Sequence, residues 1–355
     1  MGNDATHDSP AHERYIAIDD VCAWPNLTRF ADGRIVATIF NQPTHGGWEG
    51  DVECWASDDD GRTWALTGVP APHEAGTNRM NVAAGCAADG TFVVLASGWS
   101  RRTPRGTYTS PRTGEVLPIW VCRSTDRGAT WSRSGTISPP PDRHGEVVPF
   151  GDIVQLQGDS LGVCVYGHAA GSGNPPADGG KAHVDHAAYF YVTKDAGESW
   201  TRRGTIRDHD ANETTVLALP EGRLLAVART RRDEHLDLLE SDDDGETWRE
   251  SGPVTLGGQH PGHLLLLRDG RILLSYGIRN DGLYGIGTRL SADSGQTWSA
   301  PRVVVNLEGA TDCGYPSSVE AADGTIITVY YCNSIPAHTR FHMGVMRWRV
   351  EAVEG

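Results

Sequence analysis

The stretch SDDDGRTW, residues 57–64, is one copy of an octet of the form S/T-x-D-x-G-x-S/T-W that occurs five times in the chain. The other copies read STDRGATW (124–131), TKDAGESW (193–200), SDDDGETW (241–248) and SADSGQTW (291–298). The aspartate of such an octet can accept backbone N–H hydrogen bonds within its own turn, and its glycine tolerates a positive φ. The tryptophan can anchor the turn by burying a large apolar surface. We therefore interpret the octets as structural turns, in spite of their conspicuous acidic residues.

Between the octets lie pairs of apolar runs, each pair joined by a short polar turn that contains glycine. Two apolar runs that flank such a turn predict a β-hairpin. Six of these turns alternate with the octets, at Asp32-Gly33, Asp89-Gly90, Gly158-Asp159, Glu221-Gly222, Asp269-Gly270 and Asp323-Gly324. This periodicity predicts an all-β chain with a single domain over residues 1–355, built from six repeated units.

Composition indicates which binding partners, cysteine sites and cellular location to expect. The 355 residues carry 31 Lys+Arg against 46 Asp+Glu, a formal net charge of −15, which argues against nucleic-acid and membrane partners. The seven cysteines form no CxxC pair, so neither a disulfide framework nor a cysteine zinc site is expected. The first fifteen residues have no apolar core, so we expect no signal peptide and a cytoplasmic location.

The octet is the Asp-box, and its regular use here resembles the sialidase superfamily of six-bladed β-propellers. The resemblance implies six four-stranded antiparallel blades and glycoside hydrolase activity on a glycan. The sixth unit lacks an octet and would close the ring by combining residues 341–350 with residues 15–18. Hairpin turns and Asp-boxes should share one face of such a ring, so functional residues are expected on the opposite face, where the hairpins open.

Two motifs resemble catalytic stretches of the sialidases. The segment NETTVLALPEGRLLAVAR, residues 212–229, is similar to the stretch that carries the catalytic glutamate and one substrate arginine, which implies these roles for Glu213 and Arg229. The segment GYPSSV, residues 314–319, is similar to the stretch that holds the tyrosine nucleophile. The resemblance therefore implies that Glu213 deprotonates Tyr315. A tyrosine nucleophile suits an anionic sugar, which would repel a carboxylate nucleophile.

Other motifs depart from the family. Sialidases bind the substrate carboxylate with three arginines, and the first belongs to an Arg-Ile-Pro run that here reads Ala-Trp-Pro at 23–25. The missing arginine argues against sialic acid itself, because bidentate arginine binding is hard to replace. Arg279 is the candidate for the third arginine. The loop that carries the family's acid/base aspartate offers Asp51, which we prefer, and Glu49.

Further polar residues are expected around the open hairpin ends. The candidates for substrate binding there are Trp24, His45, Arg79, Asp152, His168 and His260. Other polar residues at the same ends are Asn26, Asn81, His263, Asp312 and Tyr330. No HExxH or similar motif occurs, so no metal and no cofactor are expected. A long connection at about 98–118 carries Arg101, Arg102, Arg105 and Arg112, which could attract an acidic sugar such as a uronate.

Two alternatives keep the fold and change the function. A polysaccharide lyase or a His/Tyr-dependent glycosidase acting next to a uronic acid would use His260 or His45 together with Tyr315. A non-catalytic carbohydrate-binding propeller would bind sugar without turnover, because a fold does not dictate a function. The oligomeric state is not determined by these patterns.

Overall fold

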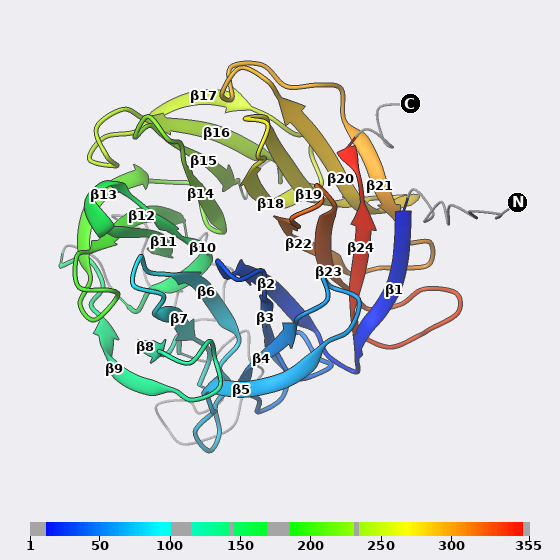
Figure 1. Ribbon diagram of the computed structural model, residues 1–355, viewed down its shortest axis with the longest axis horizontal. Coiled ribbons are helices and arrows are strands. Elements are labelled where there is room, and N and C mark those ends of the chain that lie inside the picture. The colour runs from blue at the N-terminus through cyan, green and yellow to red at the C-terminus, as the bar shows by residue number, and fades with distance from the viewer. Residues whose placement is uncertain (1–11, 101–114, 142–144, 169–184, 231–233, 351–355) are drawn as a thin grey trace, which may run out of the picture.

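The computed structural model describes residues 12–100, 115–141, 145–168, 185–230 and 234–350. In this part of the chain it contains 24 β-strands and one short 3₁₀ helix, η2 (Gln157–Asp159) (Figure 1). The strands are β1 (His12–Asp19), β2 (Ala23–Arg29), β3 (Ile35–Phe40), β4 (Val52–Ser57), β5 (Ala65–Ala71), β6 (Asn81–Cys86), β7 (Phe92–Ser97), β8 (Ile119–Ser124), β9 (Ser132–Ile137), β10 (Val148–Gln155), β11 (Leu161–His168) and β12 (His186–Thr193). They continue with β13 (Thr201–Arg207), β14 (Thr214–Ala218), β15 (Leu224–Arg229), β16 (Leu236–Ser241), β17 (Arg249–Pro253), β18 (Gln259–Leu266), β19 (Ile272–Asn280), β20 (Leu283–Ser291), β21 (Arg302–Asn306), β22 (Cys313–Glu320), β23 (Ile326–Cys332) and β24 (His342–Trp348).

The prediction of an all-β chain is confirmed. Within the described residues the strands form four sheets of four strands and one sheet of eight, in which β10 lies next to β6. Six separate four-stranded sheets were expected, and two of them are joined because β10 pairs in parallel with β6 over Gly151↔Ala83 and Asp152↔Ala84. No helix in the described ranges has the length and apolar character needed to span a membrane.

The predicted turns lie where the sequence pattern puts them. Each of the six x-Gly turns joins the first and second strands of a four-stranded group, which pair antiparallel. Each octet joins the third and fourth strands, for example β4 and β5. In that octet the carboxylate of Asp59 accepts hydrogen bonds from the backbone N–H of Thr63 (2.9 Å), from the Thr63 hydroxyl (2.7 Å) and from the Ser57 hydroxyl (2.8 Å). The octet aspartates are therefore occupied within their own turns.

The strand directions place the octets away from the open hairpin ends. In each group the first strand runs in the same direction as the third, because each of them pairs antiparallel with the second strand between them. An octet follows the end of the third strand, so it lies at the same end as the hairpin turn. The starts of the first strands therefore lie at the opposite end of every group.

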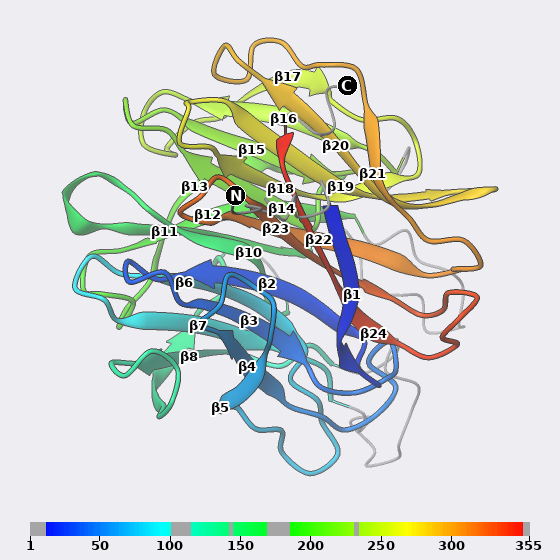
Figure 2. The same ribbon diagram turned by 45° about the vertical axis from the view of Figure 1, so that its right-hand side comes forward.

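The first strands surround a common centre. In Figure 1 the strands β2, β6, β10, β14, β18 and β22 lie nearest the middle of the view. Each contacts the next in this order, and β22 contacts β2 in turn. The last group is completed by the N-terminal strand, because β1 pairs antiparallel with β24 (Figure 2). This pairing joins the two segments that were expected to close the ring.

The core fills the spaces between neighbouring groups of strands. Buried apolar side chains in the described residues form six clusters, and each cluster draws on two adjacent groups. The octet tryptophans pack at the edges of these clusters, as Trp131 does beside β2–β5 residues. Where groups approach most closely, glycine is required: a Cβ on Gly204 of β13 would stand 2.2 Å from the carbonyl oxygen of Gly245 in the next octet.

Candidate functional site

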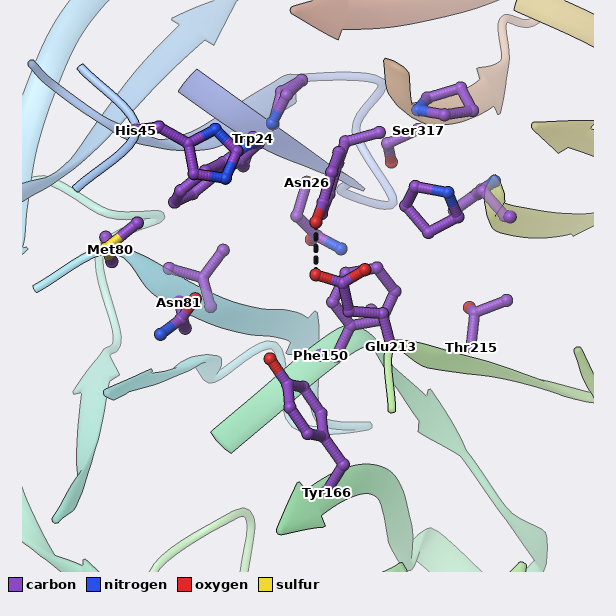
Figure 3. A pocket seen from close by; sticks show the side chains of 18 of the residues that line it. Trp24, Asn26, His45, Met80, Asn81, Phe150, Tyr166, Glu213, Thr215 and Ser317 are labelled. Atoms are coloured by element: carbon purple, nitrogen blue, oxygen red, sulfur yellow. Dashed lines mark hydrogen bonds between the residues drawn. The ribbon is translucent and has the colours of Figure 1, made fainter. Parts of the chain in front are cut away.

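The starts of the first strands enclose a cavity of about 460 Å³. This volume is in the range of small-molecule sites, about 300–1,000 Å³. The residues that line it come from all six strand groups: Trp24, Pro25, Asn26, His45, Met80, Asn81, Val82, Trp99, Phe150, Gly151, Tyr166, Glu213, Thr215, Pro261, Gly262, His263, Tyr315, Pro316 and Ser317 (Figure 3).

Irregular backbone directs several of these side chains into the cavity. The registers of β2, β10, β18 and β22 with their second strands each shift near the cavity end. Bulges of this kind bend a strand and change the direction of its side chains. Trp24 and Tyr315 lie at two of the shifts and have positive φ values of 45° and 50°. Such conformations are costly for non-glycine residues and persist where the surrounding structure holds them, often at functional sites.

Tyr315, Glu213 and Arg229 form a continuous hydrogen-bonded chain beside the cavity. The Tyr315 hydroxyl donates to one carboxylate oxygen of Glu213, and Arg229 Nη1 donates to the other. Figure 3 shows the Tyr315–Glu213 bond as the dashed line that ends on the labelled Glu213. Arg279 lies over the Tyr315 ring, with 5.5 Å between its Cζ atom and the ring centroid. The hairpin β14–β15 explains the 16-residue spacing of Glu213 and Arg229, because both residues lie at its open end.

Burial and charge shift the pKa values of this group in opposite directions. Burial raises the pKa of Glu213, but Arg229 and the hydrogen bond from Tyr315 outweigh burial, so the pKa is lowered. Burial, and then the charge of Glu213, raise the pKa of Tyr315 well above its ordinary value. At neutral pH the pair is therefore a carboxylate that accepts from an un-ionised phenol. This is the arrangement of a base bonded to the proton that it would remove.

A second polar cluster lies at the ends of three alternate groups. Asp152 accepts a hydrogen bond from Asn26 Nδ2 (2.8 Å) and pairs with His263 Nε2 (3.0 Å). Asn26 and His263 both line the cavity. Asp152 was predicted to bind substrate but does not line the cavity. It orients the side chains of Asn26 and His263, which do.

His45 faces the cavity and has a carboxylate behind it. Its Nδ1 atom lies 3.2 Å from Asp312 Oδ2, and the other carboxylate oxygen of Asp312 accepts a hydrogen bond from Tyr331 (2.5 Å). Burial raises the pKa of Asp312, while the hydrogen bonds from His45 and Tyr331 outweigh it and lower the pKa. A carboxylate on Nδ1 fixes the imidazole so that its Nε2 atom is available elsewhere.

The two acids predicted in the first-group loop do not line the cavity. Asp51 accepts hydrogen bonds from the backbone N–H of His73 (2.7 Å) and pairs with His73 Nδ1 (2.6 Å). Glu49 lies 3.5 Å from Nε2 of the same imidazole. Both acids lie in the loop between β3 and β4 and pair with His73, and His45 from the same loop lines the cavity.

Two other predicted residues contact the protein rather than the cavity. Arg79 is buried, donates to the Pro118 carbonyl oxygen (2.9 Å) and stacks on the Trp120 ring at 3.6 Å. His168 packs edge-on against the His186 ring, with 5.7 Å between the ring centroids. Neither is a lining residue.

His260 is buried next to the cis-proline Pro261 and does not line the cavity either. Burial, followed by the charges of Arg229 and Arg279, lowers the pKa of His260 to about 2. This imidazole is therefore neutral.

At the open end of β23 the tyrosine that reaches Asp312 is Tyr331, one position after the predicted Tyr330. Tyr330 was chosen at the open end of β23, but its hydroxyl accepts from Arg14 (2.9 Å) in the core between two groups. Its neighbour Tyr331 reaches Asp312 and accepts from Arg279 Nη2 (3.0 Å). Successive side chains of a strand point to opposite faces, and a run of two tyrosines does not reveal which one faces the centre.

Several lining residues had no signal in the sequence. Phe150, Thr215 and Pro261 lie in apolar or neutral stretches that resemble ordinary strand interiors. In the described ranges, no group of three or more His, Cys, Asp or Glu side chains is arranged to bind a metal ion. Arg101, Arg102, Arg105 and Arg112 lie outside the described residues.

Comparisons with known proteins agree with this architecture. Residues 71–328 match the family model described as BNR repeat-like domain. Among solved structures, a protein of unknown function from Dyadobacter fermentans aligns with a TM-score of 0.78 and 21% identity, covering 96% of this chain and 100% of that one. Among curated proteins, none matches.

Two of the similar structures are sialidases. The Hadza microbial sialidase Hz136 aligns with a TM-score of 0.69 and 18% identity over 93% of this chain, and Trypanosoma rangeli sialidase with 0.69 and 14% over 98%. This chain covers 66% and 60% of those two proteins. At these identities the likeness concerns the fold.

Proposed function

The chain belongs to the family of BNR repeat-like domains, and from this premise we propose that it is a sialidase-like glycoside hydrolase. One observation carries the proposal: the Tyr315 hydroxyl donates to the Glu213 carboxylate at the edge of a cavity that both residues line. A nucleophile bonded to its base, with the base held by a third group such as Arg229, is the general arrangement of nucleophilic catalysis.

The proposal includes the architecture on which the site depends. We interpret the chain as one six-bladed β-propeller, in which the eight-stranded sheet supplies two blades that share the β10–β6 pairing. The order of contacts among the first strands and the six core clusters between groups support this interpretation. The glycan end would enter from the face opposite the Asp-boxes.

In the first step Tyr315 Oη attacks the anomeric carbon and its proton passes to Glu213. The glycosidic C–O bond breaks, and protonated His45 donates its Nε2 proton to the leaving oxygen. Asp312 Oδ2 lies 3.2 Å from His45 Nδ1 and orients the imidazole for this transfer. The high pKa of Tyr315 does not prevent attack, because Glu213 takes the proton as the new bond forms.

In the second step water attacks the anomeric carbon of the sugar bound to Tyr315. His45, now neutral, takes the proton of the water, and the C–O bond to Tyr315 breaks. The proton on Glu213 returns to Tyr315 Oη. The sum is addition of one water to one glycosidic bond, with two inversions and therefore retention at the anomeric carbon.

Hydrolysis of a panel of aryl glycosides, including sialosides, uronides, rhamnosides and common hexosides, tests the proposal. We expect Tyr315→Phe to lower kcat on the best substrate by roughly 10³-fold, because the attacking oxygen is lost. Tyr330→Phe is the matched control, since that hydroxyl bonds Arg14 far from the cavity, and we expect it to retain wild-type kcat. Failure of the wild type to cleave any glycoside at high enzyme concentration would refute the hydrolase.

Elimination beside a uronate is the second candidate, and the observation in its favour is the His45–Asp312 pair at the cavity. His45 would remove the C5 proton and Tyr315 would protonate the leaving oxygen. Elimination and hydrolysis both release a new reducing end, but only elimination forms an unsaturated uronate, which absorbs in the ultraviolet. An absorbance increase during cleavage would therefore identify elimination.

A further inference from the structure

We infer that the cavity binds an uncharged sugar, which it recognises by its hydroxyl groups and by an apolar face of its ring. The inference rests on the proposed function and specifies its substrate class. It runs against the acidic sugar that the tyrosine nucleophile and the arginine-rich connection suggested, and it does not favour the uronate required for elimination.

The charges at the cavity do not favour a carboxylate. None of its 19 lining residues in the described part of the chain is Lys or Arg, and Glu213 is the one Asp or Glu among them. Two more carboxylates, Asp152 and Asp312, lie directly behind lining imidazoles. A substrate carboxylate would enter a cavity bordered by three carboxylates, in a chain whose net charge is −15.

The two neighbouring arginines are already engaged by the protein. Arg229 donates from Nη1 to the Glu213 carboxylate, while its buried Nε has no partner among the described residues. Arg279 donates from Nε to the Cys313 carbonyl oxygen (2.8 Å) and from Nη2 to Tyr331 (3.0 Å). Bidentate binding of a carboxylate needs two parallel N–H groups of one guanidinium. In Arg279 one of the edges that could supply such a pair, the edge formed by Nε and Nη2, is occupied by these two bonds.

The unpartnered polar atoms of the lining fit hydroxyl groups instead. Within the described residues, five such atoms are buried without a hydrogen-bond partner and belong to lining residues: Trp24 Nε1, Asn26 Oδ1, Asn81 Nδ2, Thr215 Oγ1 and His263 Nδ1. Buried polar atoms without partners are rare and call for an explanation such as an absent ligand.

These unpartnered atoms include both hydrogen-bond donors and hydrogen-bond acceptors. Asp152 accepts from Asn26 Nδ2, which leaves Asn26 Oδ1 as an acceptor. Asp152 also pairs with His263 Nε2, and in the tautomer that carries its proton on Nε2 the Nδ1 atom is an acceptor. Trp24 Nε1 and Asn81 Nδ2 are donors. A sugar hydroxyl both donates and accepts, whereas a carboxylate only accepts and would be repelled by the two acceptors.

The remaining wall is apolar. Trp24, Met80, Trp99, Phe150 and Tyr166 present aromatic or thioether surface to the cavity. Figure 3 shows Met80, Phe150 and Tyr166 around the space that Glu213 also faces. Such surfaces bind the C–H face of a ring, while a few polar groups fix its orientation.

Calorimetric titration of the Tyr315→Phe variant with matched sugar pairs tests the inference, because this variant keeps every charge at the site. The pairs are the methyl glycosides of glucose, galactose and mannose with the corresponding uronides, and methyl sialoside with its carboxyl methyl ester. In every pair that binds, we expect the neutral member to bind at least tenfold more tightly. Equal or tighter binding of the charged member would overturn the inference, as would the absence of binding by both members of all pairs.

A charge inserted into the lining provides a second test. We expect Asn81→Arg to shift the ratio of affinities toward the charged member by at least tenfold, and Asn81→Gln to leave the ratio unchanged. An unchanged ratio in a folded Asn81→Arg variant would count against the inference. Hydrolysis separates this result from the proposed function: cleavage with a preference for uronides or sialosides refutes only the inference, whereas neutral binding without any cleavage refutes only the hydrolase.

Discussion

Replacing Glu213 by Gln tests how much the negative charge of Glu213, in the cavity wall, contributes to the free energy of unfolding. The Glu213 side chain is 12% exposed, and it accepts from both Arg229 and Tyr315. Glutamine has one acceptor oxygen: if that oxygen accepts from Tyr315, an amide donor faces the guanidinium of Arg229, and if it faces Arg229, it does so without a charge. That arginine, 19% exposed, is left without its counter-charge.

The expected loss follows from this geometry. Removing one partner of a buried ion pair costs about 3–5 kcal/mol, because the remaining charge stays buried and uncompensated. We therefore expect Glu213→Gln to lower the free energy of unfolding by about 3 kcal/mol or more at neutral pH. The matched control is Glu221→Gln: Glu221 is 55% exposed and lies 3.8 Å from Arg223, so its loss should cost at most about 0.5 kcal/mol.

Urea unfolding followed by the fluorescence of the 11 tryptophans measures both variants. The pKa of Glu213 is lowered in the folded state, so its stabilisation is complete above the unfolded carboxyl value of about 4.3 and disappears as the pH falls through the folded value. The difference between wild type and Glu213→Gln should therefore shrink in acid. A loss below about 1 kcal/mol at neutral pH, or a difference that grows in acid, would refute the reasoning.

Two further predictions concern the turns and the contacts between groups. Asp59→Ala should lower the free energy of unfolding by about 1–3 kcal/mol, because the N–H and hydroxyl of Thr63 lose their acceptor, and urea unfolding at neutral pH checks this. The pKa of Asp59 is lowered to about 2, so this effect should fade as the pH drops from the ordinary carboxyl range toward that value. Gly204→Ala should destabilise by about 1–3 kcal/mol or abolish soluble expression, because its Cβ would meet the Gly245 carbonyl at 2.2 Å. Gly135→Ala is the control: Gly135 lies on the corresponding strand of another group, and its added Cβ would have its nearest atom, the Glu198 carbonyl oxygen, at 3.9 Å. We expect this substitution to change the urea midpoint of unfolding little. Equal effects of the two substitutions would contradict the packing argument.

Much of the fold follows from short stretches of sequence. The six x-Gly turns and the five octets lie at the predicted strand connections, and residues 12–19 complete the last group as expected. Turn chemistry is local: in each octet the aspartate, the serine or threonine and the glycine satisfy one another within eight residues. The repeat then multiplies a single local signal, which makes the order of the strands readable without knowledge of distant contacts.

The joining of two sheets was not readable in this way. The pairing of β10 with β6 extends over two residue pairs, one of which contains Gly151 with its φ of 79°. A glycine in a strand pattern indicates freedom of the backbone, but not which neighbouring strand it approaches. The sequence pattern is the same whether the two groups remain apart or share hydrogen bonds.

The chain's own residues determined which stretches reach the cavity, and the tertiary structure decided which side chains enter it. Glu213 and Tyr315 were predicted together from their motifs, and the structure brings them into contact across 102 residues. The sequence analysis preferred Asp51 in the first-group loop and named Tyr330 at the open end of β23, whereas in the structure Asp51 pairs with His73 and Tyr330 with Arg14. His45 and Tyr331 instead bond to Asp312. The reason is that direction depends on loop geometry, on strand bulges and on the alternation of side chains, which arise from contacts between groups and leave no mark in the local sequence.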